Sequence, residues 1–196
     1  MSKEVPVVYS FSGLTPVIDP SAYVHPSAVL IGDVIIGPQA YIGGCAVLRG
    51  DFGRIVVGPE ANVQDNCTVH SLNDFDCVME KRAHIGHGAV IHGAHIGRDV
   101  LVGMNAVVLD RAEVGERTII AAMSFVKAGW KVPADVLVTG VPGRIARPLT
   151  DADREWKRWG TDAYVALAAR SLGELHACVP LTRAEADRPR LKWDLD

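Results

Sequence analysis

Branched aliphatic residues recur at every sixth position through most of the first 126 residues of the chain. A small residue, usually alanine, follows most of them four places later. This double register fits neither the period of an amphipathic helix nor the alternation of a half-buried strand. It is typical of a coil whose sides are six residues long, each placing one large and one small side chain inside. The aliphatic positions are Ile18, Val24, Leu30, Ile36, Ile42, Leu48, Val57, Val63, Val69, Ile85, Ile91, Ile96, Val102, Val108, Val114, Ile120 and Val126.

The repeat predicts a mainly β protein, a parallel β-helix built as a triangular prism from hexapeptide repeats. Successive turns would lie about 4.8 Å apart, which is the ordinary spacing of paired strands. On this geometry, about five or six turns fit between Ile18 and Lys127. Glycine often follows the aliphatic position, as at Gly43 and Gly86, where a side chain would obstruct the corner. We expect this β-helix domain to occupy residues 1–148.

The repeat is interrupted at two places. The step from Leu48 to Val57 is nine residues, and the step from Val69 to Ile85 is sixteen. The longer step predicts a loop that leaves the prism at about 71–83. Loops held on a rigid scaffold often carry functional sites, so the interruptions are the first places to search for chemistry.

The character of the sequence changes near its last quarter. From Thr150 onward, apolar residues follow helical spacing, and Thr150 with Asp153 forms a capping signal. We expect a helical appendage over 149–180 that covers one side of the prism, with Gly160 dividing it into two helices. Residues 181–196 are expected to form a tail.

Composition and charge exclude several classes of function. The 196 residues carry a formal net charge of −3, without the basic excess that attracts nucleic acid or an anionic membrane surface. The opening residues contain no apolar core of a signal peptide, and no stretch is long enough to span a membrane. The four cysteines form no C-x-x-C pair. We therefore expect a cytoplasmic protein that binds neither nucleic acid nor membrane.

Five of the seven histidines lie within 26 residues around the second interruption. Imidazole is a common metal ligand, and a hydrolytic metal site needs three protein ligands with one open position. His70 and His92 each directly follow an aliphatic repeat residue, whereas His87 stands two places after one. The three therefore cannot form one column on one face. If they share a metal, a neighbouring copy of the chain must supply one of them.

The remaining candidates have simpler interpretations. His84 and His95 directly precede repeat positions and are expected to be exposed, at most supporting a site. Cys67 occupies a small-residue position and is read as core, and Tyr164 is expected to pack from the helix. Two further histidines are expected at the surface, His25 before a proline and His176 in the helix.

Three strings of the chain resemble the γ-class carbonic anhydrases. They are LRGDFGRIVVG at 48–58, NVQDNCTVH at 62–70 and HIGHGAVIHG at 84–93. The resemblance is narrower still to the PaaY-type thioesterases of phenylacetate degradation, and it extends to WGTDAY at 159–164. It implies a left-handed coil, a hand that the repeat alone leaves open, and a homotrimer with a metal at each subunit interface.

The same resemblance assigns roles to the motif residues. His70 and His92 of one chain and His87 of the next would hold zinc, or alternatively iron or cobalt, and Gln64 would orient the metal-bound hydroxide. Three further residues would form the ion-pair network that holds the interface site together. For Arg49 and Asp65, an ordinary salt bridge between subunits is an equally good interpretation. These three residues are Arg49, Asp51 and Asp65.

Two departures from the carbonic anhydrase pattern favour a different substrate. Fast hydration of CO2 needs a proton shuttle, yet Phe52 stands where the archetypal enzyme has a glutamate. The loop at 71–76 contains no glutamate either, leaving Asp74 or Asp76 as weak substitutes. Phe52 and Phe75 would instead form an apolar wall for an acyl group. The expected activity is a metal-dependent thioesterase that hydrolyses aromatic or cyclic acyl-CoA by attack of metal-bound hydroxide.

Three alternatives stay open at this point. The chain fits a γ-type carbonic anhydrase, a hexapeptide acyltransferase that uses histidine as a general base without metal, or a non-catalytic trimeric scaffold. The sequence has no glycine-rich phosphate cradle that would single out CoA. Scattered basic residues are weak indications of phosphate contacts, namely Arg54, Lys81, Arg82 and Arg98.

Overall fold

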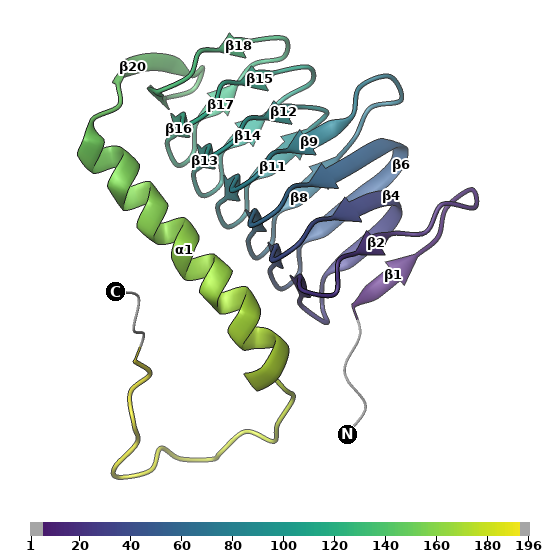
Figure 1. The fold of residues 1–196 in the computed structure, drawn as a ribbon, viewed down its shortest axis with the longest axis vertical. Helices are drawn as coiled ribbons and strands as arrows, with labels where there is room; N and C mark the ends of the chain where they lie inside the picture. Colours follow the sequence, from purple (N-terminus) through teal and green to yellow (C-terminus); the bar gives the residue numbers. More distant parts are fainter. Residues whose placement is uncertain (1–5, 193–196) are drawn as a thin grey trace.

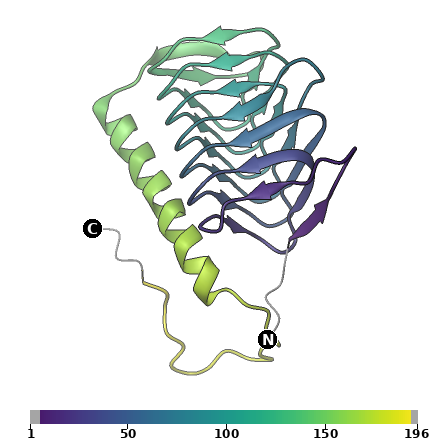
Figure 2. The same ribbon diagram turned by 45° about the vertical axis from the view of Figure 1, so that its right-hand side comes forward.

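The computed structural model describes residues 6–192 as a stack of short strands with one long helix along its side (Figure 1). Each of three faces carries seven stacked strands, so the coil has seven turns. The coil grows away from the N-terminus, and the helix runs back along it toward the first turns (Figures 1 and 2). The predicted left-handed parallel β-helix with a C-terminal helix is confirmed.

Two hydrogen-bonded sheets form the three faces of the prism. The first sheet covers two faces, because its long strands β4 and β6 bend around a vertex and pair on both sides of the bend. It contains β1 (Val7–Tyr9), β2 (Val17–Ile18), β4 (Val29–Ile36), β6 (Val47–Val57), β8 (Thr68–His70), β9 (Cys77–Met79), β11 (Val90–His92), β12 (His95–Ile96), β14 (Val107–Val108), β15 (Glu113–Val114), β17 (Phe125–Val126) and β18 (Lys131–Val132).

The second sheet forms the third face. Its strands pair in parallel except for the last pair, which is antiparallel and closes the stack. It contains β3 (Tyr23–Val24), β5 (Tyr41–Ile42), β7 (Asn62–Val63), β10 (His84–Ile85), β13 (Leu101–Val102), β16 (Ile119–Ile120), β19 (Val136–Thr139) and β20 (Arg144–Pro148).

The repeat residues form the core, as the double register predicts. Leu48, Val69 and Ile91 are partners in adjacent strands and are fully buried. Every aliphatic repeat position from Leu30 to Val126 is buried to 2% exposure or less. Large residues thus stack on large ones along the axis, and each turn buries its apolar surface against the turns above and below it.

The structure corrects one detail of the coil and extends another. The loop predicted at 71–83 is shorter, because Cys77–Met79 is strand β9, paired with β6 and β12. Within that predicted range, only residues 71–76 leave the prism. The five or six turns expected between Ile18 and Lys127 are confirmed as six, and the coil has a seventh because it already begins at Val7 and continues to Thr139.

The corner glycines are required by close contact between turns. A Cβ on Gly43 would lie 2.6 Å from the backbone nitrogen of Asp65, and one on Gly86 would lie 2.9 Å from that of Met104. The left-handed backbone conformation falls two places later, for example at Cys45 with φ of 58°. The expectation that a side chain would obstruct these corners is confirmed, and its cause is the neighbouring turn.

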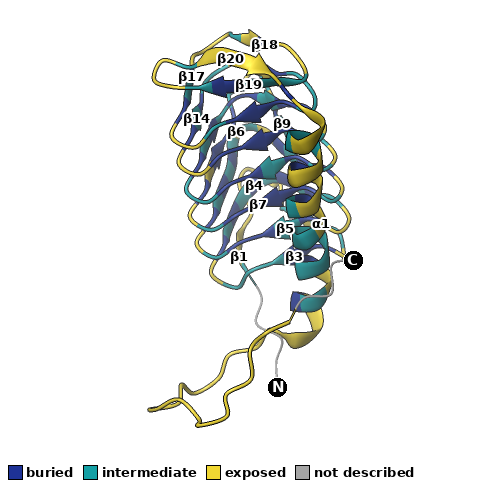
Figure 3. Cartoon of the chain, turned by 90° about the vertical axis from the view of Figure 1, so that its left-hand side faces the viewer, coloured by how far each residue is buried: buried dark blue, intermediate teal, exposed yellow. Residues whose placement is uncertain are grey.

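A single helix, α1 (Asp151–Glu174), packs on the third face against β3, β5 and β7. Gly160 does not divide it as expected, and His176 lies beyond its end. Figure 3 shows that the helix buries only the side that faces the prism. Thr150 accepts a hydrogen bond from the Asp153 backbone and the reciprocal contact is present, which confirms the capping signal.

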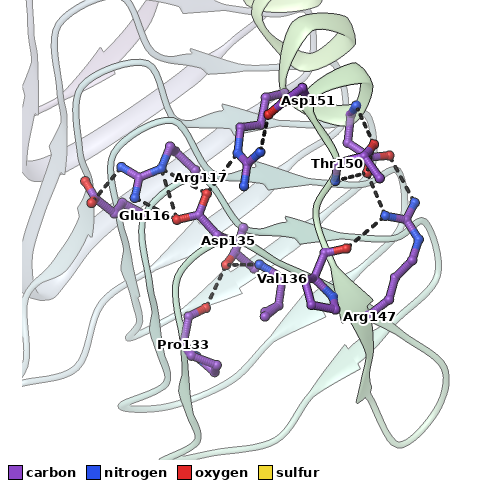
Figure 4. A network of polar contacts seen from close by, with 12 residues as sticks. Glu116, Arg117, Pro133, Asp135, Val136, Arg147, Thr150 and Asp151 are labelled. Carbon is purple, nitrogen blue, oxygen red and sulfur yellow. Dashed lines mark hydrogen bonds and ion pairs between the residues drawn. The ribbon is translucent and has the colours of Figure 1, made fainter.

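Ion pairs fix the start of the helix to the last turns of the coil (Figure 4). Asp135 pairs with both Arg117 and Arg154, and Arg147 pairs with Asp153. The helix therefore has a defined position over the third face. Within residues 6–192, no helix is long and apolar enough to cross a membrane.

Candidate metal centre

His70 and His92 lie side by side at one vertex of the prism. They end the adjacent strands β8 and β11 and are partners in register. Nδ1 of His70 is 3.0 Å from Nε2 of His92, and the ring centroids are 5.0 Å apart. These two histidines share an offset from the repeat, and the structure brings them together.

A carboxylate holds the opposite nitrogen of each ring. Asp51 Oδ1 is 3.0 Å from Nε2 of His70, and Asp110 Oδ1 is 2.5 Å from Nδ1 of His92. Because a carboxylate only accepts hydrogen bonds, these nitrogens carry the ring hydrogens. The two nitrogens that face each other are therefore both basic.

Asp51 is in turn held by Arg49, whose Nη1 lies 2.6 Å from Oδ2. Burial raises the pKa of Asp51, but hydrogen bonds from Arg49 and His70 outweigh it and keep the pKa below its ordinary value. The carboxylate consequently stays ionised and remains an acceptor for the His70 ring.

Two unprotonated nitrogens in contact are relieved by a cation between them, which is either a proton or a metal ion. Tetrahedral zinc with bonds of about 2.0–2.1 Å separates two ligand nitrogens by roughly 3.3 Å, close to the observed 3.0 Å. Metal-binding histidines also commonly donate their other N–H to a carboxylate, as both rings do here. The donor set fits zinc, iron or cobalt, although no group of three potential ligands converges among residues 6–192 of one chain.

His87 lies at a different vertex, after β10 on the third face. Its Nδ1 is 2.9 Å from Asp65 Oδ2, so Nε2 is the basic nitrogen. The Tyr164 hydroxyl from α1 lies 3.3 Å from this Nε2. Burial raises the pKa of Tyr164 to about 12, so the phenol stays protonated and donates to His87. Tyr164 therefore packs as expected and also contacts a predicted ligand.

Gln64 belongs to the same vertex as His87. Its Oε1 accepts from the backbone N–H of His87 at 3.2 Å, and its Nε2 lies 3.0 Å from Asn62 Oδ1 and 2.7 Å from His84 Nε2. Of the predicted site residues, one chain thus assembles two groups. Arg49, Asp51, His70 and His92 form one, and Gln64, Asp65 and His87 form the other.

The expected exposure of His84 is wrong. Its Nδ1 is enclosed, and its ring packs edge-on against Tyr164 with centroids 5.3 Å apart. The helix covers this position, which the local repeat does not reveal. His95, at the same offset from the repeat, is instead half-exposed beside Glu80.

The surroundings of His70 are partly apolar. The Phe52 ring lies 5.2 Å from the His70 ring and is 61% exposed. Phe75 lies in the loop 71–76 under the guanidinium of Arg111. The four basic residues considered for phosphate binding are each paired with carboxylates and form no common cradle, namely Arg54, Lys81, Arg82 and Arg98.

The structure also corrects and extends the residue assignments. Cys67 is fully buried, and burial raises the pKa of its thiol to about 11, so its assignment to the core is confirmed. Asp110 and Asn62 were missed. Asp110 follows the repeat residue Val108 by two places, the same offset as that of His87, and this offset was the available signal.

Comparisons with known proteins agree with the fold. The family model "Bacterial transferase hexapeptide (six repeats)" matches residues 93–128. The carnitine operon protein CaiE of Salmonella agona is 51% identical over 188 residues, 96% of this chain and 95% of that protein. CaiE of Escherichia coli K12 is 50% identical, with 96% of each chain covered.

Two solved structures are similar over most of their length. A putative acetyltransferase from Bacillus cereus has a TM-score of 0.83 and 34% identity, covering 84% of this chain and 95% of that one. A hexapeptide transferase family protein from Anaplasma phagocytophilum has a TM-score of 0.81 and 36% identity, covering 86% and 98%. The relatives' names refer to a carnitine operon, so the narrower resemblance to phenylacetate-degradation proteins is replaced by this one.

Proposed function

The chain belongs to the hexapeptide-repeat family of the carnitine operon protein CaiE, and from this premise we propose that it is a metal-dependent hydrolase of acyl thioesters. Hexapeptide-repeat β-helix proteins typically form trimers. In the proposed trimer, His70 and His92 of one copy and His87 of the next hold one divalent cation, zinc or alternatively iron or cobalt. The observation that carries the proposal is the contact between two basic imidazole nitrogens, each backed by a carboxylate.

The need for a second copy follows from this geometry. One chain offers two converging nitrogens, whereas a catalytic site needs three ligands and an open position. His87 presents a third basic nitrogen, oriented by Asp65, at another vertex of the same turns. Symmetric association of copies can bring such a vertex against the His70–His92 vertex of a neighbour.

The remaining residues supply orientation and a binding surface. When bound, a divalent cation supplies Lewis-acid activation of water and of a carbonyl oxygen. Asp51 and Asp110 keep the two imidazoles in the tautomers that present their basic nitrogens. Gln64 Oε1 keeps one lone pair beyond its contact with the His87 backbone and can accept a hydrogen bond from the attacking water.

The choice of a thioester rests on the surroundings of the vertex. The loop 71–76 contains no glutamate, and its Asp74 is paired with Arg111. The loop therefore offers no strong proton shuttle for CO2 hydration. Exposed Phe52 beside His70 offers apolar surface to an acyl group. The name of one similar structure, a putative acetyltransferase, supports acyl chemistry.

Acyl transfer is the second candidate. His87, held by Asp65 at 2.9 Å, has the carboxylate-oriented imidazole of a general base, and a transferase of this kind needs no metal. In that case the acyl group passes to an amine or hydroxyl acceptor instead of water.

One preparation tests both candidates. We would measure metal content, oligomeric state and turnover of a panel of short, branched and aromatic acyl-CoA esters, with and without a chelator. Hydrolase activity predicts free CoA release in proportion to bound metal, lost in His87→Ala together with the metal. Release of CoA only when an acceptor is added, and unaffected by chelation, would establish the transferase. A metal-replete trimer inert with and without acceptors would refute both and leave a scaffold.

A further inference from the structure

We propose that His84 is a positioning residue that fixes the side-chain amide of Gln64, so that only the amide oxygen faces the reacting water. The inference rests on the proposed function, because it assigns a device to the same site. It starts from one contact, the 2.7 Å distance between Nε2 of Gln64 and Nε2 of His84.

This contact determines the tautomer of His84. An amide nitrogen donates hydrogen bonds and does not accept them. His84 Nε2 must therefore be the acceptor, and the ring hydrogen must lie on Nδ1. A ring protonated at Nε2 would place two donors against each other at this distance.

The other contacts of Gln64 agree on its orientation. Oε1 accepts from the His87 backbone N–H, and Nε2 donates its second hydrogen to Asn62 Oδ1. Turning the amide over would place its oxygen against Asn62 Oδ1 and its nitrogen against the His87 N–H. Three neighbours thus agree on one orientation, and His84 is the acceptor for the amide hydrogen that Asn62 does not engage.

The environment of His84 keeps the ring neutral. Burial, the positive charge of Lys157 and the proximity of His87 lower the pKa of His84 to about 3. Nδ1 is enclosed and has no hydrogen-bond partner among residues 6–192. Such an unpaired buried donor costs free energy, so its presence needs a compensating role, which the contact with Gln64 provides.

The helix completes this enclosure. Tyr164 lies edge-on to the His84 ring, and a Cβ on Gly160 would lie 3.8 Å from its Cε1, an ordinary contact distance. Helix α1 therefore covers part of the ring, whose Nδ1 is enclosed. A helix 90 residues from Gln64 in sequence thereby controls how that glutamine presents its amide.

As a consequence, the Gln64 amide can act toward a water molecule only as a hydrogen-bond acceptor. Both hydrogens of the Gln64 amide are engaged, by Asn62 and by His84. Gln64 can then only accept a hydrogen bond from a water molecule, and this orients the water's lone pairs away from the amide and toward the carbonyl carbon under attack. His84 supplies one of the two acceptors that leave no amide hydrogen for the water.

Two substitutions separate this role from simple packing. His84→Leu removes the acceptor and should lower kcat by roughly 10–100-fold, as changes beside metal ligands commonly do, with KM and metal content unchanged. His84→Gln restores a carbonyl acceptor and should recover most of kcat. The matched control is His95→Leu, because His95 holds the same offset from the repeat but lies beside Glu80 away from Gln64.

Equal loss in His84→Leu and His84→Gln, or loss of metal in step with kcat, would indicate a packing role and overturn the inference. A second measurement is independent of turnover. 15N NMR of the wild-type trimer at neutral pH should show that His84 is the Nδ1–H tautomer. It should also show that the side-chain amide hydrogens of Gln64 exchange slowly with solvent. An Nε2–H tautomer or an imidazolium would contradict the assignment even if no substrate is found. Normal kcat in His84→Leu together with lost activity in His87→Ala would reject the positioning role of His84 but not the proposed function.

Discussion

Two vertices carry the predicted metal ligands, each of which is backed by a carboxylate, and the second vertex also holds a histidine that is not. At the first, Asp51 and Asp110 accept from the outer nitrogens of His70 and His92 and leave two basic nitrogens in contact. At the second, Asp65 backs His87 in the same way, whereas the His84 ring accepts from an amide and carries its hydrogen on the enclosed Nδ1. A carboxylate neighbour thus leaves the other ring nitrogen unprotonated and able to bind a cation. The amide neighbour of His84 instead occupies its unprotonated nitrogen, so this ring is not available to a cation.

A histidine on another face of the prism extends the comparison. His95 directly precedes a repeat residue just as His84 does, yet it lies half-exposed beside Glu80. The backbone positions are equivalent, so the difference comes from what covers them. In a stacked coil, the chemistry of a residue is set by neighbours one turn away and by any element that packs over the face.

The largest predicted effect comes from two variants, each of which lacks the proposed metal ligand of a different vertex. His70→Ala and His87→Ala should each lower activity by more than about 100-fold, because each removes a proposed ligand and even supporting residues are worth 10–100-fold. Co-refolding the two variants should restore activity at about a quarter of the sites if the copies assemble at random. The readouts are turnover and metal content of the mixture.

The control is a mixture of His70→Ala with His92→Ala. Both lesions lie on the same vertex, so no pairing of these chains rebuilds a complete site. Restoration in this mixture, or its absence in the first, would show that the ligands do not come from two copies.

A smaller effect is expected from the carboxylate behind His92. Asp110→Asn keeps the shape but replaces an ionised acceptor with a neutral amide, so metal affinity should fall by roughly 10–100-fold. Competition with a fluorescent chelator measures the affinity directly. Glu80→Gln makes the same chemical change behind His95 and should leave metal binding unaltered, and an equal loss there would mean that general charge, not position, matters.

At the second vertex, His84 should make the free energy of unfolding depend on pH. The pKa of His84 is about 3 in the folded protein, below the ordinary value of about 6.5, so between these values the unfolded chain binds a proton that the folded chain does not. Stability therefore falls as the pH is lowered, by about 2 kcal/mol between about pH 6 and about pH 4.5. Urea unfolding of His84→Gln should show a loss on acidification smaller by that amount. Parallel pH profiles of the two proteins would refute the buried neutral ring.

The coil was predictable because its information is local and repeated. A large and a small residue in each six define the inside of the prism, and the burial of positions such as Leu48 and Ile91 follows directly. The loop at 71–83 was overestimated because Met79 occupies a repeat position without a branched side chain. An unbranched apolar residue fills the same space, but it does not show in a search for Val, Ile and Leu.

The site was predictable only in part, for a related reason. His70 and His92 share an offset from the repeat, so their contact follows from the sequence. The burial of His84 depends on a helix that begins more than 60 residues later and on the face it covers. No local pattern near His84 contains that information, since His95 has the same pattern and a different environment.

The smallest predicted effect concerns the loop beside the first vertex. Arg111 pairs with Asp74 and lies 5.8 Å from the centroid of Phe75, so it ties the loop 71–76 to the coil. The pair is half-exposed, and Arg111→Ala should change the free energy of unfolding by less than about 1 kcal/mol. Because Phe75 then loses its support as part of the acyl-binding surface, KM should rise roughly two- to fivefold, equivalent to an exposed cation–π contact of about 0.5–1 kcal/mol. Arg98→Ala, which removes an equally exposed arginine paired with Glu116 on another face, should leave KM unchanged, and a matching rise there would remove the loop from the substrate site.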